Sequence, residues 1–297
     1  MKYGMDLLLN LLKPMDDFYK NIKKYGEFLP GKYVKYKPKP VDIDYSIEYG
    51  LYWISNSDYF KKIPKTSTVL MSLETFKILT SLNLIDDNIN ILLCKEVRKT
   101  YSNILYDLYP YLFKESKLKK LKNKNAFVGK NVTIGNNINM GNNVVIYDNV
   151  VIGDNVTIGD NVVIGSKGVA FDQQNDNKLI RFPQIGGVII EDNVEIGSFC
   201  DIKRGALKNT IISNGVKMGA FNNIGHNVFI GENCFISMRC NVCGSSIIGK
   251  GSTLWVNSTI KHKIIIPEES IIGSNTYVDK NFDKIGIILL GIPAKEK

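Results

Sequence analysis

Aliphatic residues recur at every sixth position through most of the sequence after residue 128. The longest unbroken block runs from Ile212 to Val278, and shorter blocks run from Val128 to Ile164 and from Ile190 to Ile202. Each hexad follows the pattern aliphatic-Gly-x-x-small-x. A fixed short period is typical of solenoids, whose repeats pack against their neighbours. The pattern predicts a mainly β fold, a parallel β-helix with one short strand per hexad and three hexads per 18-residue coil.

The same pattern predicts the role of each hexad position. The aliphatic residue points inward, and Gly and Asn lie at the corners, where we expect a positive φ. Two segments interrupt the register: residues 165–189, and residues 203–210, which hold four extra residues. Interruptions in a solenoid often carry binding loops, although a tolerated surface loop is the simpler alternative.

The first part of the chain lacks the hexads and predicts a small α/β domain. Helix-like spacing covers residues 5–12 and 16–25, and a turn-rich extended link follows at 29–40. We expect strands at 51–55, 67–72 and 89–93, a helix over 95–113 ending around Pro110, and a linker at 117–125. The expected domains are 1–122 (α/β), 123–283 (β-helix) and 284–297 (a C-terminal tail).

Composition and charge indicate the compartment of the protein and the kinds of partner that it could bind. The 44% hydrophobic and 23% charged residues are ordinary for a soluble protein, and neither a spanning segment nor a signal peptide is evident, which predicts a cytoplasmic protein. Residues 1–126 hold 22 Lys and Arg against 14 Asp and Glu. This excess suits phosphate-bearing ligands or an acidic partner such as an acyl carrier protein, or else is only a solvated lysine-rich surface. No motif for nucleic-acid binding accompanies the charge.

The five cysteines predict buried thiols and no metal site. Cys200, Cys234 and Cys240 occupy the fifth position of a hexad, where small residues otherwise stand. Although Cys240 and Cys243 form a CxxC pair, no second pair and no spaced histidines complete a zinc set.

The hexads resemble the left-handed β-helix of the hexapeptide acyltransferases, and the left hand is implied by this family rather than by the period. The resemblance implies a homotrimer with active sites between subunits. Carbonic anhydrase-type proteins share the fold but need three histidines, and this chain has only two.

Three motifs in the repeat region resemble the UDP-3-O-acylglucosamine N-acyltransferases of lipid A synthesis. The chain reads Val-Ala-Phe at 169–171 and Phe-Pro-Gln-Ile-Gly at 182–186, then Lys-Arg-Gly-Ala-Leu at 203–207, then Ile-Gly-His-Asn-Val at 224–228. The resemblance implies that Phe171, Gln184 and Arg204 belong to an acceptor loop. Lys203 replaces the family's aspartate, and Met-Gly-Ala-Phe at 218–221 replaces Ile-Asp-Asn-Leu, so the sugar pocket is open to change.

The resemblance extends into the first domain. Trp-Ile-Ser-Asn-Ser-Asp-Tyr at 53–59 is similar to the family's uridine motif, Phe-Leu-Ser-Asn-x-x-Tyr. It implies that Trp53 and Tyr59 flank the uracil ring and that Asn56 hydrogen-bonds its edge. A uridine nucleotide is therefore the expected ligand of this domain.

The 18-residue coil predicts the chemistry at His226. Residues 18 apart stack one strand spacing, roughly 4.8 Å, apart, so His226 is followed by Gly244 and then by His262. A histidine beside a glycine amide suits acyl transfer: the imidazole of His226 acts as general base, and the N–H of Gly244 stabilises the oxyanion. His262 either contacts the donor or is a solvated corner residue.

The C-terminal sequence bears on the donor. Gly-Ile-Pro-Ala-Lys at 291–295 resembles the tail of hexapeptide acetyltransferases, which implies a donor contact for Lys295, and the C-terminal helices of the lipid A enzymes are lacking. We therefore expect an N-acyltransferase that uses acyl-CoA, acetyl or short hydroxyacyl, on a nucleotide-linked amino sugar for surface glycan synthesis. The alternatives are the lipid A enzyme with an acyl carrier protein donor, an O-acyltransferase, and a non-catalytic scaffold that binds a sugar nucleotide.

Overall fold

The computed structural model describes residues 18, 22–31, 39–40, 50–112, 119–120 and 125–297, which form two compact units. Among the described residues, the β-helix unit comprises 119–120, 125–169 and Gln184–Lys297. The α/β unit comprises Leu8–Lys114 and Ala170–Pro183. Part of the first interruption of the hexads, Ala170–Pro183, thus groups with the α/β unit, whereas the C-terminal tail groups with the β-helix unit.

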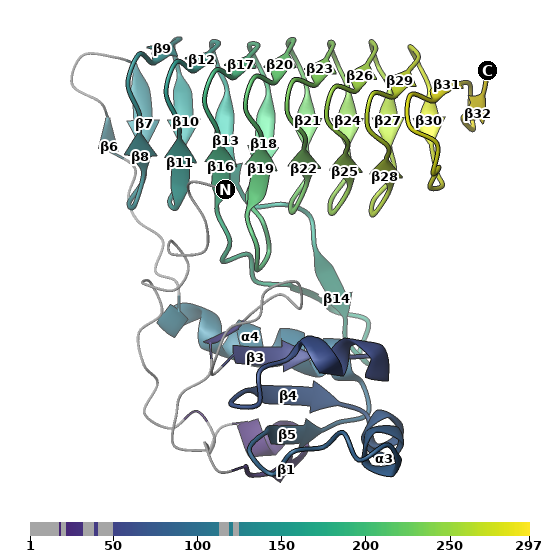
Figure 1. Cartoon of the computed structure of the whole chain (residues 1–297). Coiled ribbons are helices and arrows are strands. Elements are labelled where there is room, and N and C mark those ends of the chain that lie inside the picture. The colour runs from purple at the N-terminus through teal and green to yellow at the C-terminus, as the bar shows by residue number, and fades with distance from the viewer. Residues whose placement is uncertain (1–17, 19–21, 32–38, 41–49, 113–118, 121–124) are drawn as a thin grey trace. The chain divides into compact units, whose positions relative to one another are not determined.

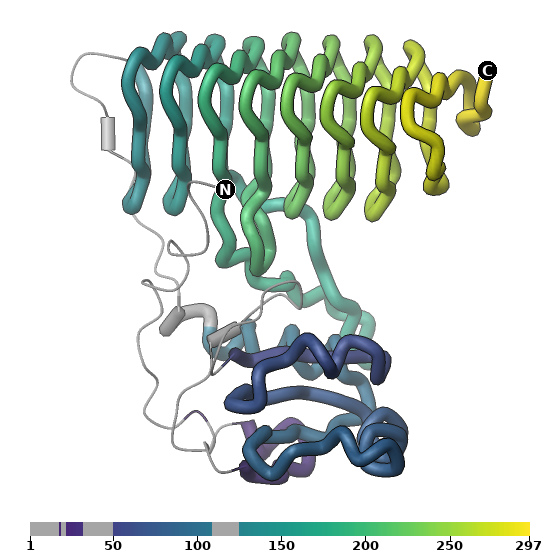
Figure 2. Tube along the Cα trace, viewed as in Figure 1, coloured from purple at the N-terminus to yellow at the C-terminus, as the bar shows by residue number. Residues whose placement is uncertain are grey.

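The predicted β-helix is present and is built from three sheets, which are drawn coil by coil in Figures 1 and 2. Sheet I contains, in spatial order, β30 (Tyr277–Val278), β27 (Thr259–Ile260), β24 (Asn241–Val242), β21 (Asn223–Ile224), β18 (Asp201–Lys203), β13 (Val163–Ser166), β10 (Val144–Ile146), β7 (Ala126–Val128) and β6 (Lys119–Lys120). Sheet II contains β28 (Ile265–Ile266), β25 (Ile247–Ile248), β22 (Phe229–Ile230), β19 (Thr210–Ile212), β16 (Val188–Ile190), β11 (Val150–Ile152) and β8 (Thr133–Ile134). Sheet III contains β32 (Lys295–Glu296), β31 (Ile288–Leu290), β29 (Ile271–Ile272), β26 (Thr253–Leu254), β23 (Phe235–Ile236), β20 (Lys217–Met218), β17 (Glu195–Ile196), β12 (Thr157–Ile158) and β9 (Asn139–Met140).

The strands within each sheet are parallel, except for the β6–β7 and β31–β32 pairs. From β19 to β30 the register advances by 18 residues per coil, as in the pairing of Ile212 with Ile230 and of Ile230 with Ile248. Two coils are longer because they contain the interruptions: Ile164 pairs with Ile202, and Ile202 pairs with Ile224. The helix is left-handed, as the family resemblance implied.

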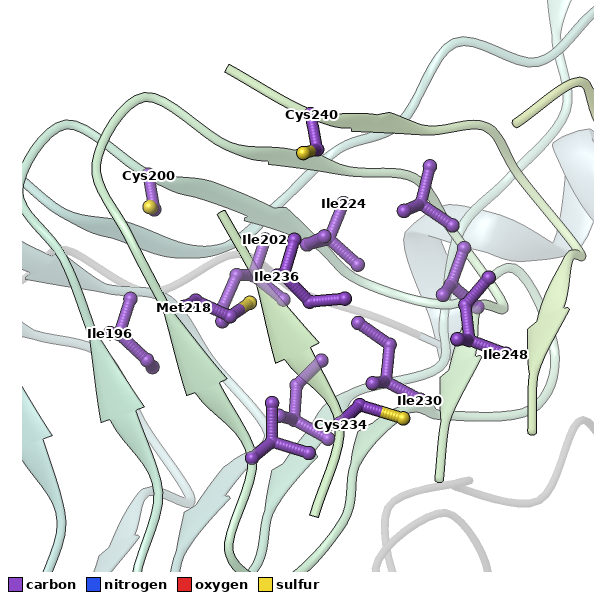
Figure 3. Packing of buried hydrophobic residues seen from close by; sticks show 14 of the residues in the cluster. Ile196, Cys200, Ile202, Met218, Ile224, Ile230, Cys234, Ile236, Cys240 and Ile248 are labelled. Atoms are coloured by element: carbon purple, nitrogen blue, oxygen red, sulfur yellow. The ribbon is translucent and has the colours of Figure 1, made fainter. Parts of the chain in front are cut away.

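The aliphatic residues fill the interior, which confirms their predicted direction. Ile224, Ile230 and Ile236 come from three consecutive hexads, one in each sheet, and all are fully buried in the core shown in Figure 3. Cys200, Cys234 and Cys240 are buried with them, which confirms the prediction of buried thiols for these three; Cys94 is buried too, whereas Cys243 is only half-buried. Burial raises the pKa of the Cys200 and Cys234 thiols to about 11. Both thiols therefore stay protonated at neutral pH.

The corners correct one prediction. The residue with positive φ is the fourth of the hexad, which is Asn in many coils, for example Asn227 at 61° and Asn257 at 59°. Asn tolerates this conformation better than other residues that carry a Cβ. The glycine at the second position is required for a different reason: a methyl group at Gly225 would lie 2.5 Å from the backbone nitrogen of Gly244. The coils approach too closely there for a side chain.

The α/β unit holds a five-stranded sheet flanked by two described α-helices. Its strands, in spatial order, are β1 (Glu27–Leu29), β5 (Asn90–Leu93), β4 (Thr68–Met71), β3 (Gly50–Trp53) and β2 (Lys39–Pro40). The helical elements are η1 (Lys23–Tyr25) and η2 (Ser57–Lys62), both 3-10 helices, and α3 (Leu73–Ser81) and α4 (Val97–Leu112).

Only β1 is antiparallel to its neighbour in this sheet. The three predicted strands are confirmed, and so is the helix over 95–113 as α4. Helix α3 was not predicted; it begins after Ser72, whose hydroxyl caps the backbone N–H of Thr75 at 3.1 Å. The helices expected at 5–12 and 16–25 and the linker at 117–125 lie mostly outside the described residues. None of the described helices is long and apolar enough to cross a lipid bilayer.

The segment between Ala170 and Pro183 folds as a β-hairpin of β14 (Phe171–Gln173) and β15 (Leu179–Arg181). It is fastened to α4 by polar contacts. The carboxylate of Asp172 accepts a hydrogen bond from Ser102 and lies 3.5 Å from the Nε of Arg98. Lys99 donates to Asn175 at 2.6 Å. This hairpin is therefore structurally part of the α/β unit.

Candidate active site

His226, Gly244 and His262 lie one above another at the corner between sheets I and II. Each residue follows a strand of sheet I, and β21, β24 and β27 pair in register. Backbone hydrogen bonds connect the coils at this corner, from Ser245 to the carbonyl of His226 at 2.8 Å and from Lys263 to that of Gly244 at 3.1 Å. The column predicted from the 18-residue period is thus present.

The imidazole of His226 lies directly against Gly244. A methyl group at Gly244 would lie 2.6 Å from the Nε2 atom of His226 and 2.9 Å from its Cδ2 and Cε1 atoms. Such distances are shorter than a van der Waals contact, so only glycine leaves room for the ring. The Nε2 atom of the imidazole therefore faces the backbone of Gly244.

The other ring nitrogen of His226 is held by Asn227. The Nδ1 atom lies 2.9 Å from the side-chain Oδ1 of Asn227. The same Oδ1 accepts a hydrogen bond from the backbone N–H of Ala206 at 2.9 Å, and the backbone N–H of Asn227 donates to Thr210 at 2.9 Å. Because Oδ1 already accepts from Ala206, the carbonyl side of the amide faces the ring.

This arrangement selects one tautomer of the neutral imidazole. An amide oxygen only accepts hydrogen bonds, so Nδ1 must carry the proton. The lone pair then lies on Nε2, beside Gly244. His226 is consequently oriented as a base whose reactive nitrogen faces a backbone amide.

The backbone N–H of Gly244 is available for a ligand. In the first coils, where an aspartate stands one coil further on, the N–H at the third hexad position donates to it, as Lys130 does to Asp148 at 2.7 Å and Asn142 to Asp160 at 2.6 Å. His262 takes the aspartate's place above Gly244. Among the described residues, no hydrogen bond uses the N–H of Gly244.

Arg204 occupies the position of His226 one coil earlier, because that coil has 22 residues. Arg204 is 3% exposed, and its guanidinium donates to the carbonyls of Gly186 at 2.7 Å and Asp148 at 2.8 Å. These contacts fasten the loops below the histidine. The neighbouring Lys203 contacts the Asp201 carboxylate and donates to the hydroxyl of Ser166 at 3.1 Å.

The other two acceptor-loop residues from the sequence lie in different units. Gln184 is 1% exposed in the β-helix unit and accepts a hydrogen bond from the N–H of Gly168 at 2.6 Å. Phe171 lies in the hairpin of the α/β unit, half exposed, with the guanidinium of Arg181 4.4 Å from its ring centre.

The residues of the uridine motif lie at and after the carboxyl end of β3. Trp53 ends the strand, and its ring centre lies 6.4 Å from that of Tyr101. Asn56 caps η2 by accepting from the N–H of Asp58 at 2.9 Å, and Tyr59 is exposed within η2. Ligands of open sheets with parallel strands bind outside the carboxyl ends of those strands.

The two expected donor contacts lie on different sheets. His262 is exposed and belongs to the corner column of His226. Lys295 is exposed in β32, at the end of sheet III. No group of His, Cys, Asp or Glu in the described part of the chain has the arrangement of a metal site.

Sequence reasoning missed two residues that contact His226. Asn227 follows the histidine directly, but its hexad position is filled by Asn in many coils, so its sequence context gave no signal of a separate role. Gly168 belongs to the interruption, and a methyl group there would lie 3.0 Å from the Cβ and Cδ2 atoms of His226. Only the folded path of the loop shows this contact.

Comparison with known proteins agrees with the repeat and the motifs. Residues 137–167 and 227–262 match the family described as bacterial transferase hexapeptide (six repeats). A crystal structure of a UDP-N-acetylglucosamine acyltransferase superimposes with a TM-score of 0.50 at 19% identity, covering 61% of this chain and 72% of that one. The enzyme of that name from Bacteroides fragilis gives a TM-score of 0.50 at 18% identity, with 60% and 74% coverage. At these identities the likeness is one of fold.

Sequence relatives are more specific. A UDP-3-O-acylglucosamine N-acyltransferase of Sulfurimonas denitrificans is 34% identical over 126 residues, which are 42% of this chain and 40% of that protein. The enzyme of that name from Campylobacter lari is 33% identical over 118 residues, 40% of this chain and 37% of that protein. The chain therefore matches about two fifths of the length of these relatives.

The fold is a left-handed β-helix of hexapeptide repeats, and two stretches of it match the bacterial transferase hexapeptide model. Within that class, the resemblance to the UDP-3-O-acylglucosamine N-acyltransferases, first indicated by the motifs, is confirmed.

Proposed function

We propose that this protein is an N-acyltransferase that moves an acyl group from a thioester to the amine of a UDP-linked amino sugar. The observation that carries the proposal is the imidazole of His226, whose Nδ1 is bound by Asn227 and whose Nε2 faces Gly244. A base beside an unused backbone N–H is the arrangement that acyl transfer requires.

In the proposed reaction, the amine attacks the thioester carbonyl and a C–N bond forms. The Nε2 atom of His226 takes the proton that the amine loses, and the N–H of Gly244 donates to the oxyanion of the tetrahedral intermediate. When the C–S bond breaks, the imidazolium returns the proton to the leaving thiolate. The products are an amide and a free thiol, and His226 regains its neutral form.

We assign the nucleotide of the acceptor to the α/β unit. Trp53 and Tyr59 offer aromatic faces after a parallel strand, and stacking suits a uracil ring. One N–H of the Asn56 amide donates to Asp58 at 3.1 Å, which leaves the other for a uracil carbonyl. Replacing Trp53 by Ala is expected to weaken UDP binding measured by calorimetry about tenfold or more, because a stacked aromatic pair contributes about 1 kcal/mol beyond its buried area.

The comparisons support the lipid A alternative over the short-chain acyl-CoA reading. Both sequence relatives cited above carry the name UDP-3-O-acylglucosamine N-acyltransferase. We therefore propose UDP-3-O-acylglucosamine as acceptor and a hydroxyacyl carrier protein as donor, in the cytoplasm. The excess of Lys and Arg among residues 1–126 suits an acidic carrier protein.

A direct test mixes the purified protein with UDP-3-O-acylglucosamine and either hydroxyacyl carrier protein or hydroxyacyl-CoA, and follows the products by mass spectrometry. The proposal predicts one added acyl group on nitrogen, formed faster with the carrier protein. Faster transfer from the CoA thioester would instead support the N-acyltransferase that uses acyl-CoA, which the C-terminal sequence predicted. Binding of the sugar nucleotide without consumption of either thioester would instead favour the non-catalytic scaffold.

We also propose that the β-helix unit assembles as a homotrimer through sheet II. The outward residues of this sheet form an apolar row in register, and those in its later strands are exposed: Phe229 by 38%, Ile247 by 39% and Ile265 by 48%. Exposed apolar rows of this kind mark interaction surfaces. Light scattering should show a trimer for the native protein and a smaller species for Ile247→Lys; a native monomer would refute this assembly.

A further inference from the structure

The first interruption of the β-helix leaves and re-enters that unit at two residues that hold each other. Gly168 stands just before the hairpin segment Ala170–Pro183, and Gln184 stands just after it. The N–H of Gly168 donates to the Oε1 of Gln184 at 2.6 Å, and the side chain of Gln184 is buried. We name this pair the clasp.

The clasp packs against His226. A methyl group at Gly168 would lie 3.0 Å from the Cβ and Cδ2 atoms of His226, and 3.1 Å from the Oε1 of Gln184. The backbone of Gly168 therefore contacts the histidine side chain, while the backbone of Gly244 contacts its Nε2. The imidazole is confined by two glycines that come from segments far apart in the sequence.

The clasp contains a buried polar atom that lowers the stability of the fold. The Nε2 atom of Gln184 is fully buried and has no hydrogen-bond partner among the described residues. An unsatisfied buried donor lowers the stability of the fold, and an apolar side chain of similar shape would avoid that penalty. A glutamine here suggests a benefit elsewhere, and the one hydrogen bond that its side chain makes among the described residues positions Gly168 against the histidine.

We propose that Gln184 is a positioning residue: it holds the backbone of Gly168 against His226 and so fixes the imidazole over Gly244. This inference rests on the proposed function of His226 as general base. The chain between the two clasp residues is the hairpin segment of the α/β unit, so the clasp lies where the polypeptide leaves and re-enters the β-helix unit.

The test compares Gln184→Met, which keeps the length of the side chain but loses the acceptor, with Gln173→Met, the same change at an exposed position of the hairpin. We expect kcat of Gln184→Met to fall about 10- to 100-fold with little change in either KM, because a small misplacement of a base has effects of this size. The thermal midpoint should stay equal or rise, since the unsatisfied amide is gone. Native kcat, or a loss of kcat that tracks a lower midpoint, would overturn the proposal.

A second measurement does not depend on transferase activity. Diethylpyrocarbonate acylates neutral imidazoles, and mass spectrometry can follow His226 and His262 separately in one sample. Gln184→Met should raise the modification rate of His226 severalfold relative to that of exposed His262, and Gln173→Met should not. An unchanged ratio would refute the clasp. A raised ratio in a protein without any transferase activity would refute the proposed function and leave the clasp standing.

If Gln184→Met does not fold, Gly168→Ala is the replacement variant. The added methyl group presses on the imidazole from the clasp side, so the ratio of His226 to His262 modification should change while the fold, seen by circular dichroism, does not. An unaltered ratio in the folded variant would refute the contact.

Discussion

Asn227 and Asn257 have the same backbone conformation and different partners. Both are the fourth residue of a hexad, with φ of 61° and 59°. Asn257 donates through Nδ2 to the Oδ1 of Asn275, one coil further on, at 2.7 Å. Asn227 instead faces the Nδ1 of His226 and accepts from the N–H of Ala206.

The difference comes from the coils on either side. One coil beyond Asn227 stands Ser245, which cannot continue a ladder of amides, and one coil before it lies the four-residue insertion that contains Ala206. The repeat therefore sets the backbone of Asn227, whereas the interruption sets its partners. Asn227 thus keeps the backbone conformation of a structural corner residue, while its side chain contacts the candidate base.

The largest effect should come from removing the base. His226→Ala is expected to lower kcat by about 10²- to 10⁴-fold, the usual contribution of general acid–base catalysis. His262→Ala, in the same column one coil beyond Gly244, should lower it far less. Steady-state kinetics on both variants tests this order. A larger loss of kcat for His262→Ala would show that His226 is not the general base.

Gly244→Ala should have the next largest effect. The added methyl group would lie 2.6 Å from the Nε2 of His226, so the ring must move from its place over the amide. A displacement of about 1 Å can lower the rate about 10²-fold. Cys243→Ala, at the preceding residue, is the matched control and should retain most of the activity. Equal kcat values for the two variants would contradict the close contact.

A smaller effect separates the two asparagines directly. Asn227→Ala and Asn257→Ala both place alanine at positive φ, which costs about 1–2 kcal/mol in each case. Urea unfolding should therefore show similar losses of stability. Only Asn227→Ala should also lower kcat, by about tenfold or more, because the imidazole loses the acceptor that selects its tautomer. If both variants keep native kcat, Asn227 is only a corner residue.

The smallest effect concerns the core rather than the site. Burial raises the pKa of the Cys200 and Cys234 thiols to about 11, from an ordinary value of 9.0. The unfolded chain therefore ionises first, and stability present below pH 9 is lost as pH rises toward 11. Between pH 8 and pH 10.5 the free energy of unfolding, measured with urea, should fall in the native protein. With both cysteines replaced by Val, this fall should be smaller by on the order of 1–2 kcal/mol per thiol. An identical pH dependence would show that the thiols are not desolvated.

The fold could be predicted from the sequence because the six-residue repeat is visible within any short stretch of the β-helix region. Inward Ile224, Ile230 and Ile236 are spaced by six residues, and the same arithmetic brought His226 to Gly244. The prediction that the second-position glycines adopt a positive φ was wrong. Glycine is needed there because the backbone of the next coil leaves no room for a side chain. Helix α3 was missed although Leu73, Phe76 and Leu79 recur at helical spacing, because it is short and directly follows a β-favouring run.

The remainder of the site could not be predicted for a physical reason. The contact of Gly168 with His226 joins residues 58 positions apart, and it depends on how a non-repeating segment folds. Asn227 is chemically identical to the corner asparagines that form ladders, so only its neighbours in space distinguish it. The buried guanidinium of Arg204 likewise fastens the backbones of Gly186 and Asp148, contacts that no periodicity encodes.

The most direct test of the candidate site is the tautomer of His226, read from the ring nitrogen chemical shifts of ¹⁵N-histidine-labelled protein. In the His262→Gln variant a single imidazole remains, so its signals need no further assignment. The structure predicts that the neutral form of the ring carries its proton on Nδ1, with Nε2 unprotonated beside Gly244. A neutral ring protonated at Nε2 would contradict the role of Asn227 and, with it, the assignment of His226 as the general base.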